Sequence, residues 1–328
     1  MSQNILNYDV VVIGAGSAGL TSAMYSARSG LKTVIIERGI HGGQMQKTKI
    51  IENYSGFAPI EGHKLSYYMY QQAIEHNVSY MYGDVIDVSE VYETVEDMIS
   101  NSNKSFYVKL SDGTIIDTKT VIIATGVEHR ELGLKNEKKL QGRGVSYCAI
   151  CDGNFFKGKH VAVVGGGDSA LEESVYLTSI VDKVTLIHRG SQFTGQKILQ
   201  NRVFSNSKIE IMFNSQVTDI LGENKVEKLE ITSTLNGNTS CINVDGIFIY
   251  IGMDPVSSPF KNLGIVNERG YIETDENMMT KATGVFAVGD IREKKMRQIA
   301  TAVGDGAIAG TYVRTYIDSL GWLIWIWQ

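Results

Sequence analysis

The sequence predicts an α/β protein with two domains, each built around a parallel β-sheet, and three observations support this. The chain has 328 residues, which is enough for about two domains of ordinary size. Residues 10–37 and 159–187 each show a buried strand, a glycine-rich turn, a helix and a second strand. The apolar content of 43% and the charged content of 20% are normal for a globular protein.

The first of these segments carries a glycine pattern that is typical of dinucleotide binding. After the β-branched residues 10–13 come Gly14, Gly16 and Gly19, and Glu37 ends the second strand. Such glycines allow a tight turn and let the backbone approach a pyrophosphate at the helix N-terminus. The acid can hold a ribose hydroxyl. We therefore predict a dinucleotide site here; a purely structural turn is the alternative.

The second segment repeats the glycine pattern but has fewer residues that could bind the ribose of a nucleotide or its phosphate. Its turn contains Gly165, Gly167 and Ala170, and its second strand is followed by His188-Arg189-Gly190. No acid stands there to hold a 2′-hydroxyl, and Arg189 is a single cation where a phosphate dianion is usually held by several. This unit is either a weakened nucleotide site or a structural scaffold.

The motif Cys148-Ala149-Ile150-Cys151-Asp152 precedes the second segment. Two thiols at this spacing can close into a disulfide and open again, and so carry two electrons. The adjacent carboxylic acid can supply or take a proton. A zinc half-site is the alternative, but it would need a second ligand pair, and the third cysteine, Cys241, stands alone. We predict redox chemistry and no metal.

Composition and terminal sequence exclude several classes of protein. The net charge of −5 argues against a nucleic-acid-binding protein. Three cysteines do not make a disulfide framework, so a cytoplasmic location is expected. The N-terminus lacks the charged and apolar regions of a signal peptide, and no apolar run approaches the about 20 residues that span a bilayer.

Two later strands end in residues that suit a bound cofactor. Residues 121–123 lead into Ala124-Thr125-Gly126, whose small side chains allow a close approach of the backbone. Residues 284–288 lead into Gly289-Asp290, and a carboxylate there can accept a hydrogen bond from a ribityl hydroxyl. A helix of small residues follows, near the place expected for phosphates.

In their order, these motifs resemble the low-molecular-weight thioredoxin reductase family over essentially the whole chain. The resemblance rests on Gly14-x-Gly16-x-x-Gly19, Gly42-Gly43-Gln44, Ala124-Thr125-Gly126, Cys148-x-x-Cys151-Asp152, Gly165-x-Gly167-x-x-Ala170, and Gly289-Asp290 followed by Arg297-Gln298. It implies a homodimer that binds FAD and reduces a thioredoxin-like protein.

The resemblance also implies a domain arrangement and a role for each motif. Two Rossmann-like, three-layer ββα domains are expected, the second inserted into the first: an FAD domain of residues 1–125 and 252–328, and an NAD(P)H-binding-like domain of residues 126–251. Cys151 would be the flavin-proximal thiol, Cys148 the thiol that attacks thioredoxin, and Asp152 the proton donor or acceptor. The implied FAD contacts are Gly14, Gly16, Ser17, Gly19, Glu37, Arg38, Gly43, Gln44, Asn53, Val85, Ala124, Gly126, Gly289, Asp290, Arg297 and Gln298.

The chain departs from the NADPH-using members of this family at the site of the 2′-phosphate. Those members carry His-Arg-Arg and a further Arg four residues later, where this chain has His188-Arg189-Gly190 and Thr194. At about 1.5–3 kcal/mol for each charge-assisted contact, two losses cost roughly 3–6 kcal/mol. That energy corresponds to about two to four decades of affinity. The sequence therefore disfavours NADPH, and we expect reduced ferredoxin as the donor. The alternatives are an NAD(P)H-dependent enzyme with weakened phosphate recognition and an electron-transfer flavoprotein of the ferredoxin–NADP reductase type.

Two further segments bear on the donor. The basic residues 292–297 could steer an acidic carrier such as ferredoxin, or they form an ordinary solvated loop. All three tryptophans, Trp322, Trp325 and Trp327, lie close to the C-terminus. We expect this tail to be buried, either with an indole on the flavin where nicotinamide would sit or in a dimer interface.

Overall fold

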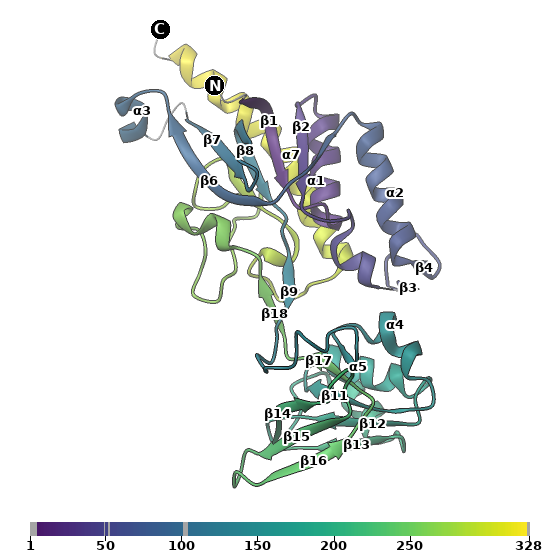
Figure 1. The fold of residues 1–328 in the computed structure, drawn as a ribbon. Helices are drawn as coiled ribbons and strands as arrows, with labels where there is room; N and C mark the ends of the chain where they lie inside the picture. The colour runs from purple at the N-terminus through teal and green to yellow at the C-terminus, as the bar shows by residue number, and fades with distance from the viewer. Residues whose placement is uncertain (1–4, 49, 52, 101–103, 327–328) are drawn as a thin grey trace. The chain divides into compact units, whose positions relative to one another are not determined.

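The computed structural model describes residues 5–48, 50–51, 53–100 and 104–326, and of residues 47, 50, 100, 150, 151 and 321–326 it describes the backbone alone. The chain forms two compact units (Figure 1). The first unit comprises residues 1–127 and 255–328, and the second comprises residues 128–254.

A mixed sheet forms the centre of the first unit. Its strands are β1 (Leu6–Ile13), β2 (Thr33–Glu37), β5 (Ser79–Tyr82), β6 (Val85–Tyr92), β7 (Lys104–Leu110), β8 (Ile115–Ile123) and β19 (Val285–Ala287). The order is β5-β2-β1-β8-β7-β6, with β19 also paired to β8. The strands β5, β2, β1, β8 and β19 pair in parallel, whereas β7 and β6 pair antiparallel.

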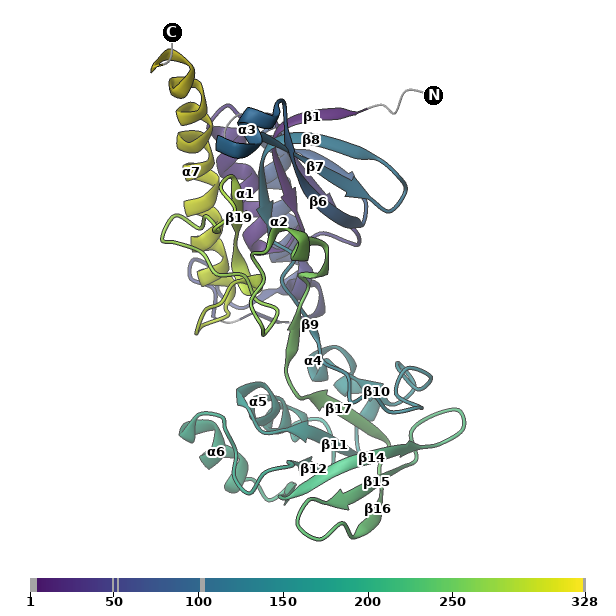
Figure 2. The same ribbon diagram turned by 90° about the vertical axis from the view of Figure 1, so that its left-hand side faces the viewer.

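Two hydrophobic cores cover the two faces of this sheet. The helices are α1 (Ser17–Arg28), α2 (Gly62–Glu75), α3 (Val95–Ser100) and α7 (Ile299–Ile326), with shorter turns η1 (Gly43–Lys47), η3 (Ser258–Leu263) and η4 (Gly289–Ile291) and the small ladder β3 (Ile50–Ile51) and β4 (Ile60–Glu61). Val10 and Val12 of β1 pack towards α1 and α7, while Val11 and Ile13 pack towards β6, β7 and η3. Figure 2 shows α7 along the helical layer and β6 and β7 on the side away from it.

The second unit repeats this layered plan. Its elements are β10 (Val145–Ser146), α4 (Ala149–Asp152), η2 (Gly153–Phe156), β11 (His160–Gly165), α5 (Asp168–Leu177), β12 (Lys183–Ile187), α6 (Lys197–Phe204), β13 (Ile209–Met212), β14 (Ser215–Leu221), β15 (Lys228–Ser233), β16 (Thr239–Asn243) and β17 (Gly246–Tyr250). The sheet β10-β17-β11-β12-β13 is parallel, and β14-β15-β16 is antiparallel. In Figure 2, α5 and α6 lie on one side of β11 and β12, and β14 to β16 lie on the other.

Two short strands, β9 (Val127–His129) and β18 (Met253–Pro255), pair with each other where the chain passes between the units. Among the helices of the described residues, none has the length and apolar content that crossing a membrane would require.

Candidate active site

The turn between β1 and α1 packs backbone closely against backbone and leaves the N-terminal end of α1 without a side-chain cap. Gly14 has φ +103°, and a Cβ on it would lie 2.5 Å from the Ala124 carbonyl oxygen. A Cβ on Gly19 would lie 1.9 Å from the Gly14 carbonyl oxygen. Gly16 caps α1 without a side-chain hydrogen bond, and the first turn of α1 has no acid. The N–H groups at this helix end therefore suit an anion such as a pyrophosphate.

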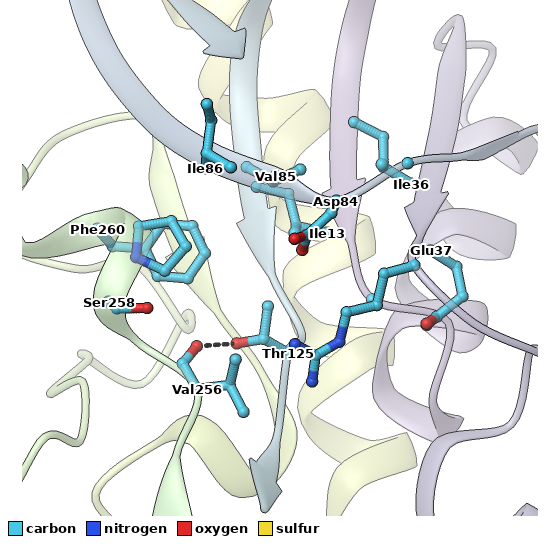
Figure 3. A pocket seen from close by; sticks show the side chains of 14 residues that line it. Ile13, Ile36, Glu37, Asp84, Val85, Ile86, Thr125, Val256, Ser258 and Phe260 are labelled. Atoms are coloured by element: carbon cyan, nitrogen blue, oxygen red, sulfur yellow. Dashed lines mark hydrogen bonds between the residues drawn. The ribbon is translucent and has the colours of Figure 1, made fainter. Parts of the chain in front are cut away.

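Glu37 and Arg38, at the end of β2, border a cavity of about 320 Å³. The two oxygens of the Glu37 carboxylate accept hydrogen bonds from the Ala15 N–H at 2.7 Å and the Gly39 N–H at 2.9 Å. Val85 forms part of the cavity wall. In Figure 3, Glu37, Val85, Thr125 and Phe260 surround the opening, and the Thr125 hydroxyl donates to the Val256 carbonyl at 2.7 Å. This cavity has the apolar wall and the fixed carboxylate that a nucleoside needs.

The loop after β2 brings Gly43 and Gln44 to the same turn. The Gly42 N–H donates to the Ala15 carbonyl at 2.6 Å, and a Cβ on Gly43 would lie 3.3 Å from Gly16 Cα. The Gln44 amide donates to the Val127 carbonyl at 2.9 Å. Further along the chain, Asn53 donates to the Gln298 side chain at 2.8 Å, so these two expected contacts lie together.

Asp290 follows β19 and has a buried oxygen that this protein leaves unused. Among the described residues, Asp290 Oδ1 has no hydrogen-bond partner. Burial raises the pKa of this carboxyl, and the charge of Asp305 adds to the effect, although Lys294 and Arg297 oppose it. An unsatisfied buried acceptor costs about 1–3 kcal/mol. A bound hydroxyl group would remove that cost.

Three of the four cations of residues 292–297 have partners within the protein, and only Lys295 is exposed. Arg292 and Lys294 bind the two oxygens of Asp305 at 2.7 and 2.8 Å, and their side chains are only 14% and 12% exposed. Arg297 donates to the carbonyls of Asp290 and Arg292 at 3.2 Å, and it lies 4.2 Å from the Tyr271 ring centroid. Most of the charge that was expected to steer ferredoxin is thus neutralised or directed inward.

The redox motif lies wholly in the second unit. Cys148 is disulfide-bonded, whereas Cys241 is free and exposed. The Ser146 hydroxyl donates to Asp152 Oδ2 at 2.6 Å and accepts the Cys148 N–H at 3.1 Å. The side chain of Cys151 lies outside the part of the chain that the structure describes. Ser146 therefore fixes the carboxylate beside the disulfide-bonded cysteine.

The second glycine turn has a compact internal structure. Gly165 has φ +152°, a Cβ on it would lie 2.3 Å from the Tyr250 carbonyl oxygen, and Ala170 is fully buried. Gly167 is the N-cap of α5. The Thr194 N–H and hydroxyl both donate to the Gly166 carbonyl, at 2.8 and 3.2 Å. The hydroxyl of Thr194, at the position of the missing arginine, therefore donates within the loop itself.

Arg189 is exposed after β12, so its cation is available to a ligand. The backbones of Trp322 and Trp325 belong to α7, but their side chains and Trp327 lie outside the described residues. The expectation that this tail is buried or stacks on the flavin therefore stays a prediction.

Sequence reasoning missed three polar residues around these sites. Ser146 stands two residues before Cys148, and its hydroxyl could have been noted as a local partner. Asp305 and Tyr250 gave no signal, because each reaches its partners only through the folding of distant strands and helices.

Comparisons with known proteins agree with this arrangement. A family model described as pyridine nucleotide-disulphide oxidoreductase matches residues 8–306. The thioredoxin reductase of Bacillus subtilis (strain 168) is 49% identical over 314 residues, 95% of this chain and 96% of the relative. The crystal structure of Lactococcus lactis thioredoxin reductase in the FR conformation has a TM-score of 0.84 at 42% identity and covers 95% of this chain and 99% of that chain. The expected α/β fold with two Rossmann-like domains is thereby confirmed.

A solved structure bears on the expected ferredoxin donor. The ferredoxin-flavin thioredoxin reductase from Clostridium acetobutylicum is 28% identical with a TM-score of 0.52, and covers 96% of this chain and 100% of that chain. This likeness is weaker than that to the Lactococcus lactis enzyme, so membership of a ferredoxin-linked subgroup is not supported. The chain belongs to the thioredoxin reductase family of pyridine nucleotide-disulphide oxidoreductases, whose members are FAD-dependent flavoenzymes.

Proposed function

We propose that this protein reduces the disulfide of a thioredoxin through a redox disulfide between Cys148 and Cys151. The observation that carries the proposal is the disulfide-bonded Cys148 in a motif whose Asp152 is held by Ser146 at 2.6 Å. Cys148 would attack thioredoxin, Cys151 would exchange electrons with the flavin, and Asp152 would donate or accept the proton. A fixed carboxylate suits that last role, because thiol exchange proceeds through the thiolate.

We assign FAD to the first unit. The uncapped helix α1 would hold the pyrophosphate, Glu37 and the neighbouring cavity would hold the adenosine, and Asp290 would bind the ribityl chain. Isoalloxazine chemistry supplies the two-electron step when the cofactor is bound. The remaining proposed contacts are Gly14, Gly16, Ser17, Gly19, Arg38, Gly43, Gln44, Asn53, Val85, Ala124, Gly126, Gly289, Arg297 and Gln298.

In this account, residues 1–127 and 255–328 form a discontinuous FAD domain, and residues 128–254 form the nucleotide-binding domain that carries the cysteines. We further propose that the protein is a cytoplasmic homodimer. Light scattering coupled to size-exclusion chromatography tests the dimer: a mass of about two chains is expected, and the mass of one chain would contradict it.

The proposed electron donor is a pyridine nucleotide, with weakened preference for NADPH over NADH. Arg189 supplies one exposed cation, while Gly190 carries no charge and the Thr194 hydroxyl donates to Gly166. A 2′-phosphate would therefore meet one cation instead of three. NADH lacks that phosphate, so the missing cations do not weaken its binding.

Steady-state reduction of thioredoxin with each nucleotide tests both the function and the donor preference. The wild type should turn over with both nucleotides and should prefer NADPH in kcat/KM by no more than about 150-fold, the value of one charge-assisted contact. The variant T194R should raise the ratio in favour of NADPH, whereas T239R, on the exposed strand β16, should not. A wild-type preference for NADPH of a thousandfold or more would contradict weakened recognition. Turnover with reduced ferredoxin but with neither nucleotide would contradict the proposed donor.

A further inference from the structure

A half-buried carboxyl group lies on α5, the helix that contacts α4 of the redox motif, and has no part in the chemistry described so far. Glu173 belongs to α5, and its Oε2 is buried without a hydrogen-bond partner among the described residues. Burial, with a contribution from the charge of Glu172, raises the pKa of Glu173 to about 7. This group can therefore change its charge near neutral pH.

The side of α5 that carries Glu173 faces α4, the short helix that contains Cys151 and Asp152. α4 contacts α5, and a Cβ on Gly153, directly after α4, would lie 3.2 Å from Leu177 and 3.8 Å from Tyr176. These two residues stand four and three positions after Glu173, so all three share one side of the helix. The charge of Glu173 raises the pKa of Tyr176, although burial is the larger cause.

Tyr250 of β17 is bound to the motif and is affected by the charge of Glu173. Its hydroxyl accepts the Ala149 N–H at 2.7 Å, at the residue that follows Cys148. Burial raises the pKa of Tyr250, and the charges of Glu173 and then Asp152 raise it further, so the phenol stays neutral. Glu173 and the Ala149 end of α4 thus act on the same hydroxyl.

The other groups around α5 leave Glu173 without a compensating cation in the described residues. Asp152 on α4 and Glu172 on α5 are both acidic, and Arg202 of α6 acts on Glu172. β11 and β12 face α5 with buried Val161, Val163, Val184 and Leu186. The remaining titratable group on the helix, Asp168, binds Gln196.

We propose that Glu173 sets the thiol reactivity of the redox motif by its charge. Reducing the Cys148 disulfide adds two electrons and breaks the S–S bond, and the two sulfurs bind two protons when both become thiols. A motif that has bound one proton carries a thiolate. A neutral Glu173 tolerates that thiolate, whereas an ionised Glu173 opposes it by charge repulsion. This inference rests on the redox role proposed above for Cys148.

The test measures thiol reactivity directly. The full-length holoprotein is reduced with dithiothreitol, desalted without oxygen, and treated with iodoacetamide between pH 6 and pH 9, and alkylation of Cys148 is followed by mass spectrometry. At pH 8, E173Q should react about 3- to 10-fold faster than the wild type, because the repelling charge is gone. At pH 6 the two should react alike.

Matched variants separate this effect from a general change of charge or fold. E223Q removes an exposed carboxylate of the same unit and should leave the rate unchanged. In a Y250F background, the effect of E173Q should persist, because the charge repulsion acts through space. Wild-type protein alone gives a second readout: its rate should depart from a single thiol titration near pH 7.

Equal rates for E173Q and wild type at pH 8, or an equal increase in E223Q, would overturn the proposal. A single-thiol titration curve in the wild type would overturn it even if E173Q failed to fold. Dithiothreitol and iodoacetamide act without a nucleotide or thioredoxin. A failure of the proposed enzyme function would therefore appear as absent turnover, with this readout intact.

Discussion

At Gly14, one added carbon atom would disturb the turn that is proposed to hold the cofactor. Its φ of +103° and the 2.5 Å approach of the Ala124 carbonyl to a Cβ mean that no side chain fits without moving the backbone. Because the same turn is proposed to hold the pyrophosphate, a shift there removes N–H donors from the cofactor. The cost of the substitution should therefore appear first as lost flavin.

We expect G14A to purify with less than about a tenth of the wild-type flavin content, measured as the ratio of absorbance at 450 and 280 nm. The control is G304A in α7, where a Cβ would meet no atom within 4 Å. G304A should keep its flavin and gain about 0.5–1 kcal/mol in free energy of unfolding, because alanine favours a helix. Full flavin content in G14A would contradict the assigned cradle.

At the scale of elements, η4 is fastened to α7 by a buried ionic cluster. Asp305, which is 11% exposed, binds Arg292 and Lys294, and it accepts the Gly289 N–H at 3.0 Å. These contacts hold the segment that presents Asp290. Removing one partner of a buried cluster leaves uncompensated charge, which costs far more than losing a surface pair.

The variant D305N should therefore lose about 3–5 kcal/mol in free energy of unfolding, measured by urea denaturation. D318N is the matched control, because Asp318 pairs with Arg314 at 48% and 47% exposure. It should lose less than about 0.5 kcal/mol. Similar losses in the two variants would show that the Asp305 cluster is not effectively buried.

At α5, the raised pKa of Glu173 makes the stability of the protein depend on pH. Burial raises the pKa of Glu173 from 4.5 to about 7, so the folded chain keeps a proton that the unfolded chain releases between those values. This contribution to stability is complete below pH 4.5 and is lost as pH rises towards 7. The shift corresponds to roughly 3 kcal/mol.

E173Q cannot ionise, so its stability relative to the wild type should rise by roughly 3 kcal/mol between about pH 4.5 and pH 8. Denaturant titrations at several pH values measure this difference, and E223Q should show a flat difference over the same range. A flat difference for E173Q would mean that Glu173 titrates in the folded chain as it does in water.

For the whole molecule, the sequence predicted those features that depend on residues close together in the chain. The spacing of Gly14, Gly16 and Gly19 predicts the turn, because those residues lie within one strand–helix junction. The exposed basic rim expected at residues 292–297 is absent for a non-local reason: these cations look exposed in sequence, but Asp305 from α7 neutralises two of them. Glu173 and Tyr250 also gave no signal, since their proximity arises only when α5 and β17 pack in one unit.

We propose that electrons follow a single route, from nucleotide to flavin to the Cys148 disulfide to thioredoxin. A chain without Cys148 should accept electrons at the flavin and fail to pass them on. Cys241, which is free and exposed, supplies a matched control for the loss of one thiol.

The most direct measurement is an anaerobic single turnover followed by flavin absorbance. We predict that NADPH or NADH bleaches the wild type, C148S and C241S, and that oxidised thioredoxin then restores the absorbance of the wild type and C241S but not of C148S. Recovery of C148S at the wild-type rate would contradict the account, because electrons would then leave the flavin without passing through this disulfide.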